Sequence, residues 1–165
     1  MIIREIQKKD AEDFLELCKK LDRETEFLLL EPGERNLTVA EQKRKIINIQ
    51  DARNKNIFLV EDEGSLIAYL GAYGGEFKRN FNTIYIVVAV LEDYTGQGIG
   101  SRLFHHLEQW GQEEEFHRFE LTVMSHNNRA INLYKKMGFE IEGLRKDALF
   151  ISGKYIDEYY MSKLI

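Results

Sequence analysis

Apolar and polar residues follow one another along this chain in two different periods, and the change of period marks the secondary-structure elements. Apolar residues three and four positions apart predict amphipathic helices, whereas short alternating or continuous apolar runs predict strands. The resulting order is strand, helix, helix, three strands, helix, strand, helix and two strands. This order predicts an α/β (α+β) fold in which a mixed sheet is flanked by helices.

The predicted strands are short runs between turn signals. The fourth is apolar at every position, which predicts a central strand covered on both faces. The sixth strand is expected to be interrupted near Gly143. Glu63-Gly64-Ser65 is expected to form the hairpin turn between the second and third strands. The strands are expected at Met1–Ile6, Asn56–Glu61, Leu66–Tyr73, Ile84–Leu91, Phe119–Val123, Phe139–Ile151 and Tyr155–Lys163.

The first two of four expected helices have start signals. Asp10 can cap the first helix. Thr38 and Glu41 form a capping box that starts the second, which reaches about Asp51. The segment between them, Glu24–Asn36, is predicted to be an acidic loop with an apolar cluster near its centre.

A glycine-rich segment, Tyr94–Leu103, opens the third helix, which extends to Trp110. The first N–H groups of a helix have no partner inside it, and glycines let a ligand approach the backbone closely. The segment therefore predicts a cradle for a pyrophosphate or similar anion, and the alternative is a glycine-rich turn that binds nothing. No P-loop pattern is present, and Gly96, Gly98 and Gly100 do not match the dinucleotide pattern G-x-G-x-x-G.

Composition narrows the class of protein. The 165 residues are 44% hydrophobic and 31% charged, which predicts a single globular domain over residues 1–165. We expect no membrane span and no signal peptide, because no apolar stretch is long enough and the N-terminus lacks a basic region. The net charge of −5 argues against a nucleic-acid partner.

Cysteine and histidine usage adds two expectations. A lone cysteine, Cys18, excludes an internal disulfide and fits a cytoplasmic protein, and its place on an apolar helix face predicts a buried thiol rather than a nucleophile. The four histidines do not form a metal-binding spacing with it, so no metal is expected.

Two segments resemble the GNAT acetyltransferase superfamily. Thr95–Gly100 resembles the family pattern [QR]-x-x-G-x-[GA], and Asn127–Phe139 resembles N-x-x-A-x-x-L-Y-x-x-x-G-F. The second segment covers the fourth expected helix, Asn128–Met137, which Gly138 ends. The order of elements also fits, so the resemblance covers nearly the whole chain. It implies a mostly antiparallel sheet whose central strands splay apart, and an N-acetyltransferase that uses acetyl-CoA.

The resemblance also implies where acetyl-CoA would bind. Its pantetheine amides would pair with the end of the central strand, Val88-Ala89-Val90, as an added strand would. Asn127 resembles an asparagine that contacts the cofactor, and the alternative is a helix N-cap. The pyrophosphate would meet the N–H groups of Gly96, Gln97, Gly98, Ile99, Gly100 and Ser101.

Tyr134 resembles the family tyrosine that protonates the departing thiolate. A phenol suits this role because its reference pKa of about 10 lies only modestly above the value of about 8.5 for a thiol. The alternative is a core aromatic residue on the apolar face of the helix.

The chain departs from the family at several positions. Thr95 replaces the usual Gln or Arg, so one phosphate contact is expected to be missing. Ile84 and Thr122 stand where family members can carry a glutamate base. The proton of an acceptor ammonium could instead leave through water to Glu26 or Glu31, or through Tyr85, with solvated surface charge as the alternative for each carboxylate.

These expectations converge on direct transfer of acetyl from acetyl-CoA to a primary amine, with no covalent enzyme intermediate. A small cationic amine is the first expectation for the acceptor. The second is a protein N-terminus or lysine. A degenerate domain that only binds acetyl-CoA is the rival from another class, and a homodimer is left open.

Overall fold

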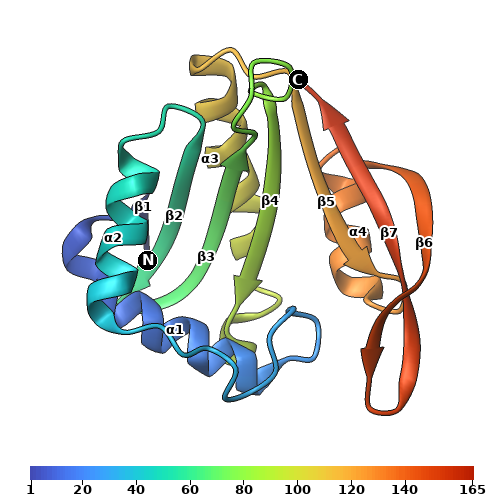
Figure 1. The fold of residues 1–165 in the computed structure, drawn as a ribbon, viewed down its shortest axis with the longest axis horizontal. Helices are drawn as coiled ribbons and strands as arrows, with labels where there is room; N and C mark the ends of the chain where they lie inside the picture. Colours follow the sequence, from blue (N-terminus) through green and yellow to red (C-terminus); the bar gives the residue numbers. More distant parts are fainter.

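The computed structural model describes residues 1–165 and builds them around one seven-stranded sheet (Figure 1). The strand order is β1-β2-β3-β4-β5-β7-β6, and every neighbouring pair is antiparallel except β4 and β5. The predicted mixed, mostly antiparallel sheet is thus confirmed. Its strands are β1 Ile2–Glu5, β2 Lys55–Asp62, β3 Ser65–Gly74, β4 Thr83–Val90, β5 Arg118–Met124, β6 Glu140–Ile151 and β7 Lys154–Leu164.

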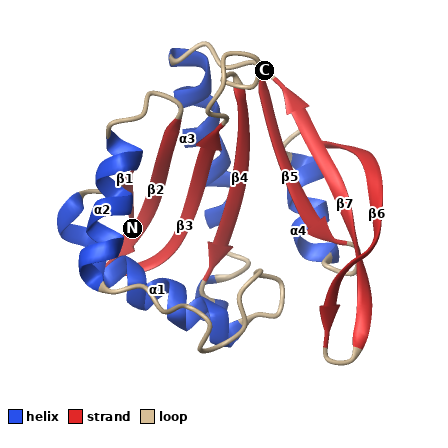
Figure 2. Ribbon diagram, in the orientation of Figure 1, coloured by secondary structure: helices blue, strands red, loops and turns tan.

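Helices cover the two faces of the sheet unevenly (Figure 2). α1 and α2 pack on one face over β2 and β3, whereas α3 and α4 lie on the other face. On the α1 side, β5, β7 and β6 therefore have no helix over them (Figure 1). The helices are α1 Ala11–Glu24, α2 Val39–Gln50, α3 Ile99–Glu113 and α4 Asn128–Lys136, with short 3₁₀ turns η1 Lys8–Asp10 and η2 Glu92–Tyr94.

Aromatic packing holds the helices against the sheet. On the α1 face, Phe14 meets Tyr69 edge to face with ring centroids 5.2 Å apart. On the other face, the fully buried Phe104 of α3 packs between Tyr134 and Phe139, at 5.8 and 5.5 Å. Such pairs add about 0.5–1.5 kcal/mol beyond their burial. The second cluster fixes α3 relative to α4, and with them the two motifs of the sequence.

β4 and β5 separate soon after they meet (Figure 1). Their parallel register covers only Thr83–Tyr85 against Arg118–Glu120. Beyond it, β4 continues to Val90 paired only with β3, and β5 continues to Met124 paired only with β7. The expected splay of the central strands is therefore present, and it leaves the facing edge of β4 without a partner strand.

Of two turn and cap signals in the sequence, the hairpin turn forms as expected and the Asp10 helix cap does not. The hairpin turn between β2 and β3 forms as expected, with positive φ at Glu63 (48°) and Gly64 (81°). Asp10 occupies the N-cap position of α1, but its carboxylate binds Arg4 and the N–H of Gln7 instead of capping that helix.

β6 is more irregular than its sequence suggests. The expected interruption is present, because the register with β7 shifts between Ile141 and Gly143. A second shift lies between Arg145 and Leu149, where Asp147 has a φ of 50°. A non-glycine residue with positive φ gives no simple sequence signal, which explains why this shift was missed.

No helix of the structure is long and apolar enough to cross a membrane.

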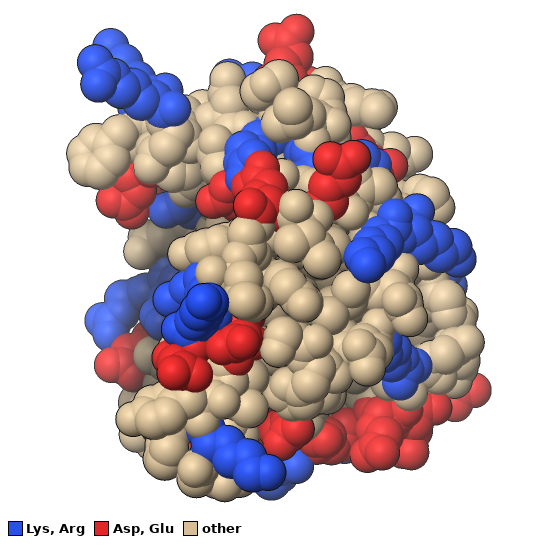
Figure 3. All heavy atoms as spheres, turned by 90° about the vertical axis from the view of Figure 1, so that its right-hand side faces the viewer, with Lys and Arg blue, Asp and Glu red and all other residues tan.

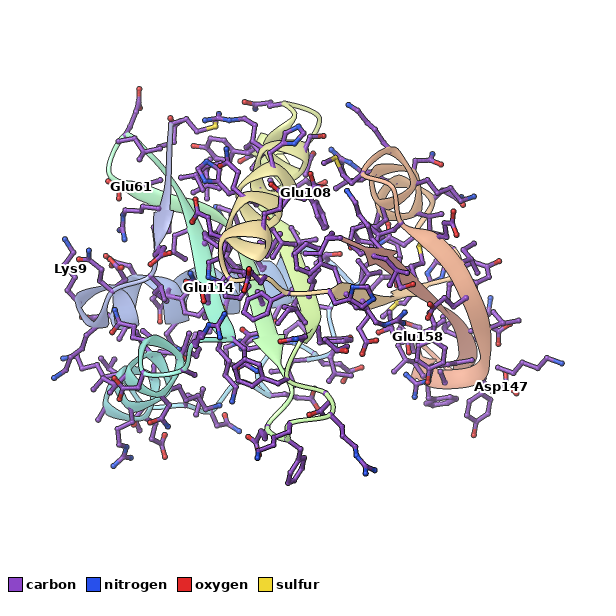
Figure 4. The ribbon with its side chains drawn as sticks, turned by 90° about the horizontal axis from the view of Figure 1, so that it is seen from above. Lys9, Glu61, Glu108, Glu114, Asp147 and Glu158 are labelled. Atoms are coloured by element: carbon purple, nitrogen blue, oxygen red, sulfur yellow. The ribbon has the colours of Figure 1, made fainter.

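On the β6 side of the molecule, side chains of both charges are intermixed (Figure 3). Arg145 pairs with Glu158 there at 2.7 Å. Seen from above, Glu158 and Asp147 lie at one end of the molecule and Lys9 and Glu61 at the other (Figure 4).

Candidate active site

One large cavity, of about 500 Å³, opens where β4 and β5 separate. Its lining comes from the end of α1 and the loop that follows it, the ends of β4 and β5, the glycine-rich turn and the start of α4. Both sequence motifs therefore face one space. The expected cofactor and catalytic residues that line it are Val88, Ala89, Val90, Gly96, Gly98, Ile99, Gly100, Ser101, Asn127 and Tyr134.

The glycine-rich turn presents unpaired N–H groups to this cavity. Gly98 is the N-cap of α3 with a φ of 77°, a conformation that glycine adopts without strain, and no side chain caps the helix. The next three residues, Ile99–Ser101, line the cavity, and their N–H groups have no acceptor inside the helix. This is the geometry of an anion site at a helix N-terminus.

Gly98 and Gly100 serve different purposes in this turn. A Cβ at Gly100 would lie 2.6 Å from Cδ2 of Leu133, so this glycine lets α4 approach α3. A Cβ at Gly98 would meet nothing within 4 Å. The absence of a side chain at Gly98 therefore leaves open space at the helix N-terminus.

The side chains of Thr95 and Gln97 are used within the turn itself. The Thr95 hydroxyl donates to the Glu92 carbonyl at 2.6 Å, although Thr95 also lines the cavity. The Gln97 amide nitrogen donates to the Asp93 carbonyl at 3.3 Å. Gln97 is the one residue of the expected pyrophosphate cradle that does not line the cavity.

The position of Tyr134 is set by the way α4 ends. Gly138 has a φ of 87° and donates to the Lys135 carbonyl, while the Phe139 N–H donates to the Tyr134 carbonyl at 2.9 Å. These two bonds form a Schellman motif, in which the rings of Phe139 and Tyr134 make the accompanying apolar contact, 6.1 Å between centroids. The sequence pattern Y-x-x-x-G-F thus holds the tyrosine in place.

The Tyr134 side chain is buried, yet its hydroxyl lies open to the cavity. The residue is 7% exposed and lines the cavity. Its hydroxyl forms no hydrogen bond within the protein. Every fully buried side-chain oxygen and nitrogen of the structure has a partner, so the unpartnered Tyr134 oxygen is not fully buried and retains access to the cavity. Burial raises the pKa of the phenol above its ordinary value, and the nearby Tyr85 adds to the shift.

Asn127 is the N-cap of α4. Its side-chain oxygen accepts the N–H of Ala130 at 3.2 Å, which is the capping alternative considered from the sequence. Its amide nitrogen forms no hydrogen bond within the protein, and the residue lines the cavity. The cap fixes the side chain so that its amide is available to a ligand.

The opposite end of the cavity is largely apolar. Leu21, Phe27, Leu28 and Met124 line it. Glu24, which the structure places in the last turn of α1 rather than in the loop, accepts the backbone N–H of Glu92 at 2.9 Å. The acidic helix end is therefore anchored directly to the segment that leads into the glycine-rich turn.

The two loop glutamates expected near an acceptor differ in position. Glu26 reaches across to His126, with Oε1 3.2 Å from Nε2, and the neighbouring Phe27 ring packs 5.1 Å from the same imidazole. Glu26 does not itself line the cavity, but both of its neighbours do. Glu31 lies in an exposed turn, where its backbone N–H donates to Glu34, and it does not line the cavity.

Tyr85 lies at the point where the strands separate, on the sheet face that carries α1. Its hydroxyl is 2.9 Å from that of Thr122. It also lines a second, small cavity of about 100 Å³ beside Arg118 and Glu142. The Arg118 guanidinium, helped by a hydrogen bond from Ser162, lowers the pKa of Glu142 to about 2. Tyr85 therefore borders a charged cluster in which the Glu142 carboxylate is kept ionised.

No group of three or more His, Cys, Asp or Glu side chains is arranged to hold a metal ion. Cys18 is buried, as expected, and burial raises the pKa of its thiol to about 12, so it has little thiolate character at neutral pH.

Sequence reasoning missed Arg129, which lines the cavity beside the glycine-rich turn. The available signal was its position inside the second motif, two residues after Asn127.

Comparisons with known proteins agree with this architecture. Residues 14–139 match the model of the Acetyltransferase (GNAT) family. The chain is 31% identical over 106 residues to the L-amino acid N-acetyltransferase AaaT of Escherichia coli (strain K12). That match covers 62% of this chain and 64% of AaaT, which is less than two thirds of the relative's length.

Two solved structures extend the likeness over the whole fold. The crystal structure of a GNAT-family acetyltransferase from Streptococcus pneumoniae superposes with a TM-score of 0.96 at 29% identity, covering 99% of this chain and 98% of that one. The structure of YncA from Salmonella typhimurium with its cofactor acetyl-CoA has a TM-score of 0.87 at 19% identity, over 99% and 93% of the two chains, and shares the fold. Since the family model matches more than half of the sequence and the fold is the same, the chain belongs to the acetyltransferase (GNAT) family.

Proposed function

We propose that this protein is an N-acetyltransferase that moves the acetyl group of acetyl-CoA to a primary amine by direct attack. The observation that carries this proposal is the single cavity at the divergence of β4 and β5, which holds an uncapped helix N-terminus, an unpaired strand edge and a buried tyrosine. Fold alone does not fix function, whereas these three groups together suit the binding and the chemistry of acetyl-CoA.

The residues present fit acetyl-CoA at two places. The N–H groups of Ile99–Ser101 suit a pyrophosphate, and the open position at Gly98 leaves room for it. The unpaired edge of β4 at Val88–Val90 offers main-chain partners to the amides of a pantetheine arm. When bound, acetyl-CoA supplies the activated thioester.

The chain's own groups would orient the reactants, stabilise charge and move one proton. Backbone N–H groups near Val90 would donate to the thioester oxygen as it gains charge. Tyr134 would donate its proton to the departing sulfur. The cavity raises the pKa of this phenol, and because burial disfavours any anion, it also raises the affinity of a buried thiolate for a proton.

For the acceptor we propose a small cationic amine, held by Glu26 and Glu31 and by the hydroxyl of Tyr85. Support comes from Glu26 and His126 beside the cavity, and from the apolar lining of Phe27 and Leu28, which suits a carbon chain. The amine would lose its proton through water to a loop carboxylate or through Tyr85. AaaT, by its name, acts on L-amino acids, and such acceptors also present a primary amine.

Two alternatives remain in the proposal. A protein N-terminus or lysine would be the acceptor if the open face of β5–β7 receives a peptide. A domain that only binds acetyl-CoA is favoured by Thr95 and by the lack of a glutamate at Ile84 and Thr122.

The test is a screen of diamines, amino acids and short peptides with acetyl-CoA, read by release of free thiol and by mass spectrometry of the product. We expect amine-dependent thiol release with a cationic small amine. Binding of CoA by calorimetry without turnover of any amine or peptide would support the binding-only module. Turnover confined to peptides would support the second acceptor class.

A further inference from the structure

The glycine-rich segment sends no cation into the cavity, because Arg102, its one basic residue, donates to the Met1 sulfur at 3.2 Å and does not line the cavity. Thr95 is uncharged, and its hydroxyl is committed to the Glu92 carbonyl. Two carboxylates, Glu24 and Glu92, belong to the cavity lining. The diphosphate of CoA carries about two negative charges at neutral pH, and backbone N–H groups offer only partial positive charge. A cavity for this ligand therefore needs a positive side chain from another element.

Arg129 is the only Lys or Arg residue that lines the cavity. It is the second residue of α4 and lies across from the turn, where its Nη2 would be 3.8 Å from a Cβ placed on Gly96. The guanidinium is thus within van der Waals reach of the segment that surrounds the anion site.

The Arg129 guanidinium also has no partner inside the protein. It forms no ion pair with any carboxylate, and it donates no hydrogen bond to another protein group. Most other arginines near the sheet are paired, for example Arg35 with Asp22 at 2.7 Å. The backbone that carries Arg129 is fixed, because the Asn127 cap holds the first turn of α4.

We infer that Arg129 supplies the phosphate-binding charge that residue 95 lacks, by donating from α4 to the diphosphate held at the start of α3. This inference rests on the proposed function, since it requires that CoA binds in this cavity. Guanidinium is suited to the role because its planar donors match phosphate oxygens in pairs. The two motifs thus hold one ligand group from opposite sides.

The test measures binding of CoA by calorimetry to the wild type, Arg129→Gln, Arg129→Lys and Lys136→Gln. Lys136→Gln is the matched control, since it removes one exposed charge from the same helix and does not line the cavity. We expect Arg129→Gln to raise Kd about 10- to 100-fold, the range supplied by a hydrogen bond to a charged group. Arg129→Lys should lose less, and the control should match the wild type.

Truncated ligands identify which group Arg129 meets. The loss in Arg129→Gln should persist with dephospho-CoA, which keeps the diphosphate, and disappear with pantetheine, which has none. Disappearance of the loss with dephospho-CoA would assign the contact to the 3′-phosphate and overturn the inference. Equal Kd values for CoA in the wild type and Arg129→Gln would overturn it too. A wild type that does not bind CoA would instead sink the proposed function.

Discussion

The hydroxyl groups of Tyr85 and Thr122 lie 2.9 Å apart and form the one side-chain hydrogen bond that joins β4 to β5. The bond lies just beyond the last residues that the two strands pair, Tyr85 and Glu120. It therefore marks the point from which the strands diverge. Thr122 lines the large cavity, so this bond places the Tyr85 hydroxyl next to the proposed acceptor site.

Removal of the Tyr85 hydroxyl should affect the acceptor more than the cofactor. For Tyr85→Phe we expect kcat/KM for the amine to fall about 2- to 10-fold, the value of one ordinary hydrogen bond. The Kd of CoA should stay unchanged, because Tyr85 does not line the large cavity. Steady-state kinetics and calorimetry check both values. Tyr155→Phe is the control, since this tyrosine is exposed on β7. An equal effect in both variants would remove Tyr85 from the acceptor site.

A carboxylate at Gly98 should prevent cofactor binding. We expect Gly98→Asp to raise the Kd of acetyl-CoA at least 10-fold, or about 1.4 kcal/mol, because its charge would face the phosphates at the start of α3. Gly153→Asp is the matched control: this glycine has a φ of 78° and open space around it, as Gly98 does. Both changes introduce the same backbone strain. The Kd of acetyl-CoA is measured by calorimetry on the folded variants. An undiminished affinity of Gly98→Asp for acetyl-CoA would contradict the phosphate site at the start of α3.

Tyr134→Phe should slow the chemical step. We expect kcat to fall about 10²-fold, the lower range for general acid catalysis, with the affinity for acetyl-CoA little changed. Burial raises the pKa of this phenol, so its proton is kept as pH rises through the ordinary tyrosine value of about 10. Loss of activity between pH 7 and 10 should therefore not come from Tyr134.

The control for that experiment is Tyr73→Phe, because burial also raises the pKa of Tyr73, to about 12, and Tyr73 does not line the cavity. Single-turnover kinetics would separate chemistry from product release. An unchanged rate of the chemical step in Tyr134→Phe would leave Tyr134 as a core aromatic residue packed on Phe104 and Phe139.

The loop glutamates should select a cationic acceptor. We expect Glu26→Gln with Glu31→Gln to raise KM for a cationic amine and to leave the Kd of acetyl-CoA intact. Most of the change should come from Glu26, which is next to residues that line the cavity. KM of the wild type should also rise with salt, because both carboxylates are exposed. Glu113→Gln serves as the control, and an unchanged KM in the double variant would favour a peptide acceptor.

Local sequence signals predicted the elements well because each one acts within a few residues. The capping box of Thr38 and Glu41 forms as expected, and Gly138 ends α4 through its positive φ. The grouping of the two motifs around one cavity was expected from the family resemblance and not from these local signals.

Contacts between distant segments were beyond the reach of these signals. His126 meets Glu26, which is 100 positions away in the sequence. Arg129 lies beside Gly96 because α4 packs against α3, with Tyr134 on Phe104 and Leu133 on Gly100. Side-chain pairs of this kind depend on how helices pack, and no spacing along the chain encodes them.

The three-residue register between β4 and β5 has a consequence for how the molecule folds and opens. β2, β3 and β4 are consecutive antiparallel neighbours, whereas β5 joins them only through a parallel contact after the long α3 connection. Loop closure of that kind is slow, so the C-terminal block should dock late in folding. In amide hydrogen exchange the same boundary should separate two cooperative units. The weakest line of the sheet is thus also the one at which the native protein would first come apart.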